Sequence, residues 1–248
     1  MNDRKMDYRS RIYQHYLTTQ AQSDIKRIRQ DLEHRAPYLR NLIRRWIPQD
    51  RAIKILDLGC GYGALLYFLK EAGYHNLQGI DHSPEQIVIA RQLGLDSVQE
   101  GDVLDILSKS GGRSCDVVIA FDVLEHLTKQ EVFDVVDEIY RVIRNRGRLL
   151  LHVPNGEGIF SGRIYFGDLT HQIAFTRQSI HQLMSAVGFD SIDFAEDTPV
   201  IHGAKSGTRY ILWKVFRSLF RMIYMAETGD RGENLILTQN LLAVVEKQ

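Results

Sequence analysis

Apolar and polar positions switch between two periods along most of this chain. Short runs of aliphatic and β-branched residues are each followed by a stretch in which apolar residues recur as they do on one face of a helix. The predicted strands are residues 53–58, 77–80, 97–99, 116–121 and 148–153, and the predicted helices are residues 63–72, 84–93, 103–109, 128–143 and 177–187. Alternation at this spacing predicts right-handed β-α-β units, a parallel sheet and an α/β, doubly wound fold.

Three of the predicted helices begin with a recognisable capping residue. Thr128 is followed in the third helical position by Glu131, which is the pattern of a capping box. Ser83 precedes Pro84, and this pair is typical of an N-cap followed by proline in the first turn. Thr176 is expected to cap the last of the helices.

The regular alternation ends at Pro154. Residues 155–175 are expected to form a glycine-rich insertion, and residues 198–234 form a second insertion before a final apolar run. The strand expected at residues 189–195 and the apolar run at residues 235–245 have no regular crossover between them. This arrangement predicts a hairpin at the sheet edge and an antiparallel last strand.

The N-terminal part has helical spacing but no strands. We expect a helical cap at residues 1–49, followed by the main domain at residues 50–248. Residues 22–47 are interpreted as a helix packed on the main domain with a solvated basic face, and a break is expected at Ala36-Pro37. For residues 8–20, packing and a lid over a substrate site are equally supported. That segment contains Tyr8, Tyr13 and Tyr16.

The composition excludes several classes of protein. Of the 248 residues, 44% are hydrophobic and 25% are charged, and 31 basic residues balance 31 acidic ones. This neutrality, without alternating aromatic and basic residues, argues against binding of nucleic acid. The two cysteines suit a reduced compartment. No apolar run reaches the length of about 18 residues that a membrane span needs, so we expect a cytoplasmic protein.

The most informative stretch joins the first predicted strand to the first predicted helix. Gly59, Gly61 and Gly63 allow a sharp turn and leave no Cβ between the main chain and a bound molecule. The helix that follows directs its N-terminal N–H groups into the same space. Gly59, Gly61 and Ala64 also satisfy the dinucleotide pattern, so an NAD-dependent oxidoreductase is a rival interpretation, although no substrate domain for it is recognisable.

Carboxylates follow three neighbouring strands and help to choose the ligand. Asp81 ends the second strand, where it can accept hydrogen bonds from two ribose hydroxyls of either a dinucleotide or an adenosyl cofactor. Asp57 precedes the first glycine, where it would repel a pyrophosphate but suit a cationic ligand. Asp102 can accept from an adenine amino group, with the Val103 N–H nearby. The structural alternative for each is an N-cap or a solvated strand end.

Four motifs in this order resemble the class I S-adenosylmethionine-dependent methyltransferases: ILDLGCGYG, GIDHSPEQIVIAR, GDVLD and DVVIAFDVLEHL. The resemblance covers roughly residues 50–195 and the last strand. It implies a Rossmann-like sheet of seven strands in the order 3-2-1-4-5-7-6 with strand 7 antiparallel, N-terminal helices and a helical insertion before the last strand. It also implies S-adenosyl-L-methionine as the cofactor.

The resemblance assigns a part of the cofactor to each motif. The glycine turn approaches the methionyl part, and Asp57 helps to hold its charged end. Asp81 holds the ribose, and the segment from Asp102 lies against the adenine. The cofactor-binding residues implied in this way are Asp57, Gly59, Gly61, Gly63, Asp81, His82, Asp102, Val103 and Phe121.

A hydroxyl acceptor needs a base, because a neutral alcohol is a poor nucleophile. The candidate catalytic residues are Glu125 and His126, after the fourth strand, and Asp168 and His171 further on. The second pair lies in a stretch that resembles the D-x-T-H-x-x-x-F-T segment of a methyltransferase subgroup linked to sugar-related biosynthesis. Two roles of His171 are equally supported. It is either a base that Asp168 orients, or a residue bonded to the backbone of a turn that Asp168 and Thr170 shape. No spacing suits metal ligands, so we expect no metal.

A basic amphipathic segment lies in the second insertion. From Lys205 to Arg221 there are five cations and no carboxylate, interspersed with apolar residues at helical spacing. Packing against the core is the favoured interpretation. The alternatives are a cover over the substrate pocket, a contact between two copies or, through residues 209–225, peripheral contact with a membrane.

The sequence favours a methyltransferase that O-methylates a sugar-containing or glycan- or lipid-linked acceptor, in the cytoplasm or peripherally at the inner membrane face. The alternative within enzymes is methylation of a quinone-type or phenolic metabolite. The alternative from another class is a non-catalytic adenosyl-binding protein associated with a membrane. We expect no nucleic-acid partner, and the residues do not distinguish a monomer from a homodimer.

Overall fold

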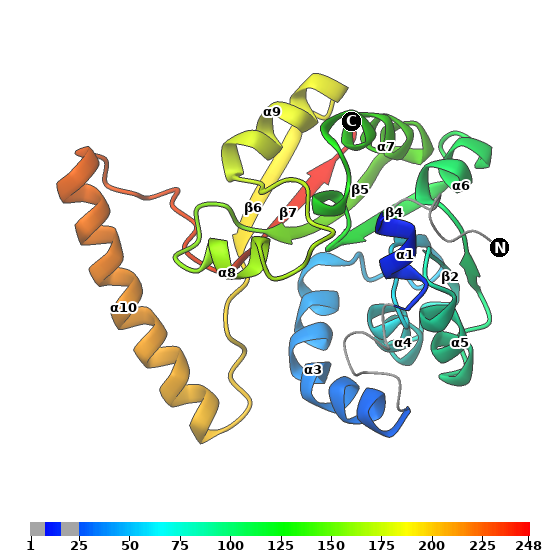
Figure 1. Ribbon diagram of the computed structural model, residues 1–248, viewed down its shortest axis with the longest axis horizontal. Helices are drawn as coiled ribbons and strands as arrows, with labels where there is room; N and C mark the ends of the chain where they lie inside the picture. The colour runs from blue at the N-terminus through cyan, green and yellow to red at the C-terminus, as the bar shows by residue number, and fades with distance from the viewer. Residues whose placement is uncertain (1–7, 16–24) are drawn as a thin grey trace.

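The computed structural model describes residues 8–15 and 25–248, and its centre is a sheet of seven strands (Figure 1). The spatial order of the strands is β3-β2-β1-β4-β5-β7-β6. Their bounds are β1 Lys54–Leu58, β2 Asn76–Asp81, β3 Val98–Glu100, β4 Cys115–Phe121, β5 Ile143–Pro154, β6 Ser191–Glu196 and β7 Asn240–Glu246. The predicted fold class and strand order are confirmed.

The direction of each strand follows from how it is connected. β1 to β5 pair in parallel, because a helix or helical segment returns the chain to the same edge between them. β7 pairs antiparallel with both β5 and β6, as the missing crossover predicts. The parallel strands therefore end together, and their carboxyl ends meet at one edge of the sheet.

Helices cover both faces of the sheet (Figure 1). Strand side chains alternate between the faces, so that Ile55 packs with one apolar cluster while Leu56 and Leu58 pack with the other. The first cluster includes residues of α3 (Ile25–Trp46), α4 (Ala64–Glu71) and α5 (Pro84–Gln92). The second includes residues of α6 (Val103–Lys109), α7 (Lys129–Val142) and α9 (Arg177–Val187).

The predicted caps form at two of the three helix starts. Thr128 and Thr176 each accept a backbone N–H in a reciprocal capping box, at the starts of α7 and α9. Ser83 occupies the N-cap position of α5 with Pro84 behind it, but its side chain makes no capping bond. The hydroxyl of Ser83 is therefore available for another partner.

The N-terminal segment contributes α1 (Tyr8–Tyr13) and the long helix α3, while Tyr16 lies outside the described residues. The expected break at Ala36-Pro37 is wrong, because α3 continues through Pro37. Leu32, Ala36 and Leu39 are buried on one face of α3 on both sides of the proline. Packing of this face on the main domain stabilises a helix that the local sequence disfavours.

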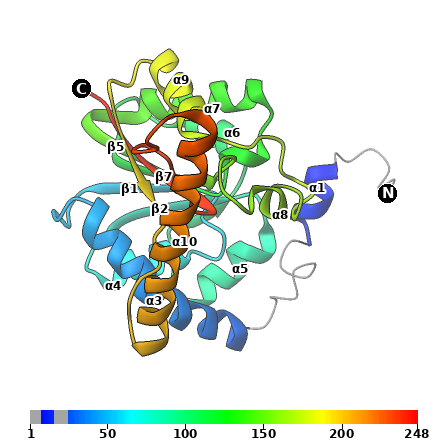
Figure 2. The same ribbon diagram turned by 90° about the vertical axis from the view of Figure 1, so that its left-hand side faces the viewer.

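Both insertions contain a helix. The first carries α8 (Ser161–Tyr165), and a short 3-10 helix, η2 (Leu124–His126), follows β4. The second carries α10 (Ala204–Thr228), which stands beside the rest of the molecule in Figure 1 and crosses in front of it in Figure 2. None of the residues of α10 is buried, so the favoured interpretation of core packing is wrong. In the described part of the chain, no helix is long and apolar enough to cross a membrane.

Candidate active site

A cavity of about 630 Å³ opens at the carboxyl ends of the parallel strands. The strand and turn residues on its wall come from the ends of β1, β2 and β4 and from the starts of α4 and α6. Of the predicted site residues, those on the wall are Asp57, Gly59, Gly61, Asp81, His82, Asp102, Val103, Phe121 and His126. The fold thus brings together residues from four motifs that are far apart in the sequence.

The glycine turn needs its glycines for backbone conformation as well as for space. Gly59, Gly61 and Gly63 all have positive φ, at 62°, 57° and 79°, where side chains are disfavoured. A Cβ on Gly59 would lie 2.4 Å from Val123, and a Cβ on Gly63 would lie 2.3 Å from Leu95. Gly63 is not on the cavity wall, and its role is to let α4 begin directly behind the turn.

Asp57 is the most deeply placed carboxylate of the cavity. It lies one residue before the end of β1, with 3% of its surface exposed. Burial, and then the negative charge of Asp81, raises the pKa of Asp57 to about 8. A cationic group bound beside Asp57 would favour its ionised form, so the site suits a ligand with a positive charge at this position.

Asp81 connects the end of β2 to the glycine turn. Its carboxylate accepts hydrogen bonds from the Gly61 N–H and from the Ser83 N–H, both at 2.8 Å. Burial raises the pKa of Asp81, and these two bonds oppose that rise. Asp81 therefore shapes the turn and also presents a hydrogen-bond acceptor on the cavity wall.

Asp102 is both a helix cap and a residue of the cavity wall. It is the N-cap of α6, and its side chain accepts from the Leu104 N–H at 2.9 Å and from the Asp105 N–H at 3.1 Å. It also lines the cavity next to Val103. The capping bonds hold the carboxylate in place at the rim of the cavity.

Ser83 and Gln86 are wall residues that the sequence analysis missed. Both are buried, and the Ser83 Oγ and the Gln86 Oε1 have no hydrogen-bond partner in the described part of the chain. The Gln86 amide lies 3.7 Å from where a Cβ of Gly61 would be. Buried polar atoms without partners are rare in proteins, and these two face a cavity that a polar ligand would fill. The only sequence signal was the position of Ser83 before α5.

The N-terminal helices form a second wall that motif reasoning also missed. Arg9 and Tyr13 of α1 line the cavity, together with Asp31, Arg35 and Leu39 of α3. Arg35 donates to the Tyr62 hydroxyl at 3.2 Å, and the same hydroxyl bonds to Asp31, which ties α3 to the glycine turn. The helix at residues 22–47 packs on the main domain as expected, but part of its polar face contributes to the cavity instead of being solvated.

Arg9 attaches α1 to the start of α7. Its guanidinium makes two bonds to the Glu131 carboxylate, at 2.8 and 2.9 Å, and a third to the His126 carbonyl at 3.2 Å. The Tyr13 ring lies 5.5 Å from the His82 ring and 6.2 Å from the His126 ring. These contacts favour the lid interpretation for the described part of residues 8–20.

His126 is the candidate base on the cavity wall. Its Nδ1 lies 2.7 Å from the Thr170 Oγ1, and that hydroxyl donates to Asp168 at 2.6 Å. Burial, and then the neighbouring His171, lowers the pKa of His126 to about 4, so its imidazole is neutral at neutral pH. With Nδ1 engaged, Nε2 is the nitrogen left for an acceptor.

His171 lies behind His126 and is not among the residues of the cavity wall. The two rings are 4.8 Å apart, and the His171 Nδ1 is 3.2 Å from the Tyr165 carbonyl. Asp168 also accepts from the Thr170 N–H at 2.8 Å, so the segment forms the turn that the structural alternative described. The geometry connects Asp168 to His126 through Thr170, whereas the sequence connected it to His171.

Glu125 is a buried carboxyl group with no exposed surface. Both of its oxygens lack a hydrogen-bond partner in the described residues, and burial followed by the charge of Asp122 raises its pKa well above the ordinary value. Glu125, His126 and His171 offer ligand atoms within 4.8 Å of one another, a set that could hold a metal ion. Sequence spacing did not predict this set, because His171 comes from a distant loop.

An ion cluster lies beside the cavity at the ends of β4 and β5. The His152 Nδ1 is 2.7 Å from Asp122, which lines the cavity, and its Nε2 is 3.7 Å from Asp197. Burial alone would lower the pKa of His152, but the two carboxylates outweigh it and raise the pKa to about 10. Asp122 has a positive φ of 54° and donates its N–H to the His152 carbonyl at 3.0 Å. The imidazolium thus holds Asp122 in an unusual conformation at the cavity.

Comparison with known proteins finds methyltransferases similar to this chain. Residues 56–151 match the family model described as a methyltransferase domain. A probable S-adenosylmethionine-dependent methyltransferase of Mycolicibacterium smegmatis is 29% identical over 153 residues, which are 60% of this chain and 56% of the relative. A ubiquinone biosynthesis O-methyltransferase of Xylella fastidiosa is 30% identical over 124 residues, which are 48% of each chain.

The fold is also similar to solved structures. A SAM-dependent methyltransferase from Archaeoglobus fulgidus aligns with a TM-score of 0.63 and 19% identity, covering 85% of this chain and 93% of that one. At this identity the likeness concerns the fold. The chain spans about half the length of the curated relatives it matches.

Proposed function

We propose a reaction for this chain, which belongs to the class I S-adenosylmethionine-dependent methyltransferase family: methylation of a hydroxyl oxygen on a sugar-containing or glycan- or lipid-linked acceptor. When bound, the cofactor supplies a methyl group that is attached to a sulfonium sulfur. Loss of this methyl group converts the sulfonium to a neutral thioether. The remaining work, which is to bind, to orient, to exclude water and to remove a proton, belongs to the residues of the cavity.

The residues present fit the cofactor class. Asp57 offers a buried carboxylate to a cationic group, and Asp81 and Asp102 offer acceptors to hydroxyl and amino groups. Ser83 and Gln86 add two buried polar atoms that lack partners in the described part of the chain. The glycine turn leaves the main chain open to close approach, as a bound molecule of this kind requires.

The observation that carries the proposal is the neutral imidazole of His126 on the cavity wall, hydrogen-bonded through Thr170 to Asp168. This chain of contacts orients the ring and leaves Nε2 free to accept the proton of the acceptor hydroxyl as the new C–O bond forms. Removal of that proton makes oxygen a competent nucleophile, a step that a neutral amine acceptor does not need. The site therefore favours O-methylation.

The polar character of the outer wall supports a polyol acceptor. Arg9, Glu131, Asp31 and Arg35 lie around the cavity beyond the strand ends and could bond to several hydroxyl groups at once. The same proposal locates the reaction in the cytoplasm, where the thiols of Cys60 and Cys115 stay free, as they are in this structure.

A phenolic or quinone-type acceptor is the second candidate. The low pKa of His126, about 4, makes it a weak base, and a weak base suits a phenol better than a less acidic sugar hydroxyl. The similarity to a relative named as a ubiquinone biosynthesis O-methyltransferase points in the same direction. A non-catalytic protein that only binds the cofactor is the candidate from another class.

The experiment is a labelled-methyl assay of His126→Gln against panels of sugar and phenolic acceptors. Turnover is expected to fall about 100-fold or more, the scale of a lost general base, while calorimetric affinity for S-adenosylmethionine stays the same. His75→Gln is the matched control, because His75 is an exposed histidine that does not line the cavity. Equal turnover in His126→Gln and the parent would contradict the assignment. Cofactor binding without turnover on any acceptor would favour the non-catalytic alternative.

A further inference from the structure

The helix α10 is a long element that the proposed reaction does not use. It is joined to the body by residues 197–203 and 229–239 and stands apart from the sheet (Figure 1). An arm of this kind contributes nothing to the cavity at the strand ends. The distribution of apolar and charged side chains around α10 indicates which kind of surface this helix suits.

The face of α10 that is turned toward the body is aromatic and polar. Its partly covered residues recur at helical spacing and include Tyr210, Trp213, Arg217 and Tyr224. The rings of Tyr210 and Trp213 stack with centroids 5.7 Å apart, and the Arg217 guanidinium lies 4.5 Å from the Trp213 ring centre. Arg217 also forms an ion pair with Glu196, which fixes the arm to the end of β6.

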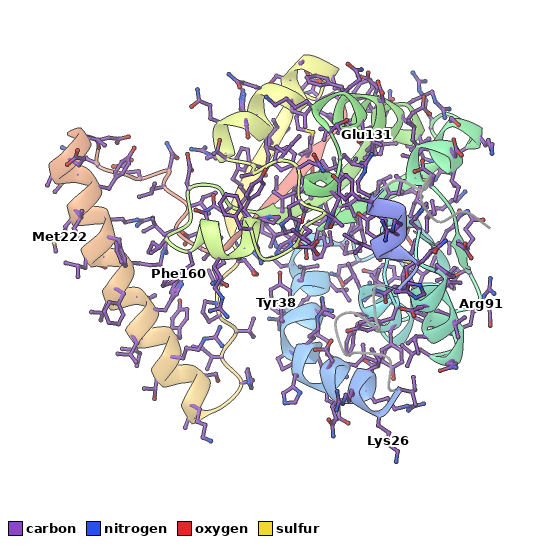
Figure 3. All side chains as sticks on the ribbon, viewed as in Figure 1. Lys26, Tyr38, Arg91, Glu131, Phe160 and Met222 are labelled. Carbon is purple, nitrogen blue, oxygen red and sulfur yellow. The ribbon has the colours of Figure 1, made fainter. Side chains whose placement is uncertain are left out.

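The opposite face of α10 is exposed and, apart from Phe216, its large apolar side chains are aliphatic. Its large apolar side chains are between 46% and 64% exposed, and Met222 lies on the side away from the body (Figure 3). The exposed set is Ile211, Leu212, Val215, Phe216, Leu219, Met222, Ile223 and Met225. This is the reverse of an ordinary surface helix, which turns its apolar face inward. A contiguous apolar face of this size marks an interaction surface.

Cations border this aliphatic face. At 3.6 residues per turn, Arg209 and Lys214 fall on opposite edges of it, and Lys205 lies near its N-terminal end. All three are exposed, and no ion pair in the described part of the chain involves them. Residues 198–226 contain no Asp or Glu. The surface therefore offers apolar contact and positive charge together.

The charges decide between a second copy of this chain and a lipid surface. If two copies paired through this face, the cations at its edges would meet cations, because the helix supplies no carboxylate there. Anionic lipid headgroups complement those cations, and acyl chains accept the aliphatic side chains between them. We propose that α10 lies in the interfacial layer of an anionic membrane, with its aliphatic face toward the acyl chains and Lys205, Arg209 and Lys214 at the headgroups.

The test is cosedimentation of the full chain with vesicles. Binding is expected to vesicles of phosphatidylcholine and phosphatidylglycerol in equal parts, to be much weaker with phosphatidylcholine alone, and to fall with added salt. Val215→Asp should weaken the partition about tenfold or more, because it removes apolar contact and adds a negative charge. Each of Lys205→Gln, Arg209→Gln and Lys214→Gln should weaken it about fivefold at low ionic strength.

Matched controls come from the opposite side of the molecule. Val88 on α5 is 53% exposed, so Val88→Asp makes the same change on another exposed helix and should leave vesicle binding unaltered. Lys109→Gln, at the end of α6, is the control for the cation variants. Equal loss in Val88→Asp and Val215→Asp would overturn the proposal, since it would show a general effect of added charge.

Light scattering in the absence of vesicles measures the oligomeric state, and so tests whether α10 contacts a second copy of this chain. A monomer that binds anionic vesicles supports the proposal. A dimer that Val215→Asp dissociates, together with no salt-sensitive vesicle binding, would overturn it in favour of an interface between copies. These outcomes do not depend on methyl transfer, so failure here leaves the proposed reaction standing.

Discussion

Asp57 shows how one buried side chain can report on its ligand. In the free protein, burial and the charge of Asp81 raise the pKa of Asp57 to about 8, so the group is protonated at neutral pH. A cationic ligand beside it favours the ionised form and lowers that pKa. Binding must then release a proton at neutral pH, and affinity must rise with pH until about pH 8 and level off above it.

This linkage is measured by calorimetric titration of S-adenosylmethionine in two buffers with different heats of ionisation. At pH 7 we expect nearly one proton to be released per cofactor bound by the parent chain, and close to none by Asp57→Asn. Asp96→Asn changes an exposed aspartate to the same amide and serves as the control. Proton uptake, or release that persists in Asp57→Asn, would exclude Asp57 as the partner of a cationic group.

Some residues of the cavity wall could be predicted from the sequence and others could not, and the reason is physical. Asp57, Asp81 and Asp102 are at strand ends or helix starts, and local pattern fixes those positions. Because the strands are parallel, these three residues meet at one edge of the sheet. Ser83 and Gln86 belong to the same wall, but their lack of partners is a property of packing that no local pattern reveals.

The choice between His126 and His171 is of the same kind. Both follow from motifs, and the sequence offered a pairing of His171 with Asp168 as one of two equally supported interpretations. Only the tertiary contact through Thr170 links Asp168 to His126 instead, and places His126 on the cavity wall. This pairing depends on which loop lies over which strand end, so it can be recognised only in the folded structure.

At the scale of elements, the alternation of strands and helices was strongly predictive. The bounds of α6 and α9 agree with the predicted residues, because each has a clear start and stop signal. The apolar run at residues 235–245 was harder to delimit, and β7 begins only at Asn240. The continuous helix through Pro37 could not be predicted, because buried contacts on both sides of the proline override a local signal.

The interpretation of α1 as a lid can be tested through the attachment of this helix. Arg9→Ala removes the bidentate contact to Glu131, a contact that lowers the pKa of Glu131 to about 2. We expect cofactor affinity to weaken about fivefold, the scale of a partly exposed ion pair of good geometry, with dissociation faster in stopped-flow measurements. Arg11→Ala removes an exposed arginine from the same helix and should have no effect. Identical dissociation rates for Arg9→Ala and the parent would mean that α1 does not cover the site.

At the scale of the whole molecule, separate uses are proposed for two surfaces. The predicted family, enzyme class and cofactor class agree with the matched family model, the relatives and the seven-stranded fold. The cavity at the strand ends carries the proposed chemistry, and the arm α10 carries the proposed membrane contact. The basic and apolar composition of that arm could be read from the sequence. Its orientation, with the aliphatic side outward, could not be predicted.

Calorimetric titration of the full chain with S-adenosylmethionine is the decisive test of whether the cavity binds an adenosyl sulfonium cofactor. Titration with NAD under the same conditions is the comparison, since both ligands need Asp81 but only one suits the buried carboxylate of Asp57. We expect saturable binding of S-adenosylmethionine at one site per chain and no heat of binding with NAD. Binding of NAD, or of neither ligand, would contradict this expectation and would remove the basis for the catalytic role of His126.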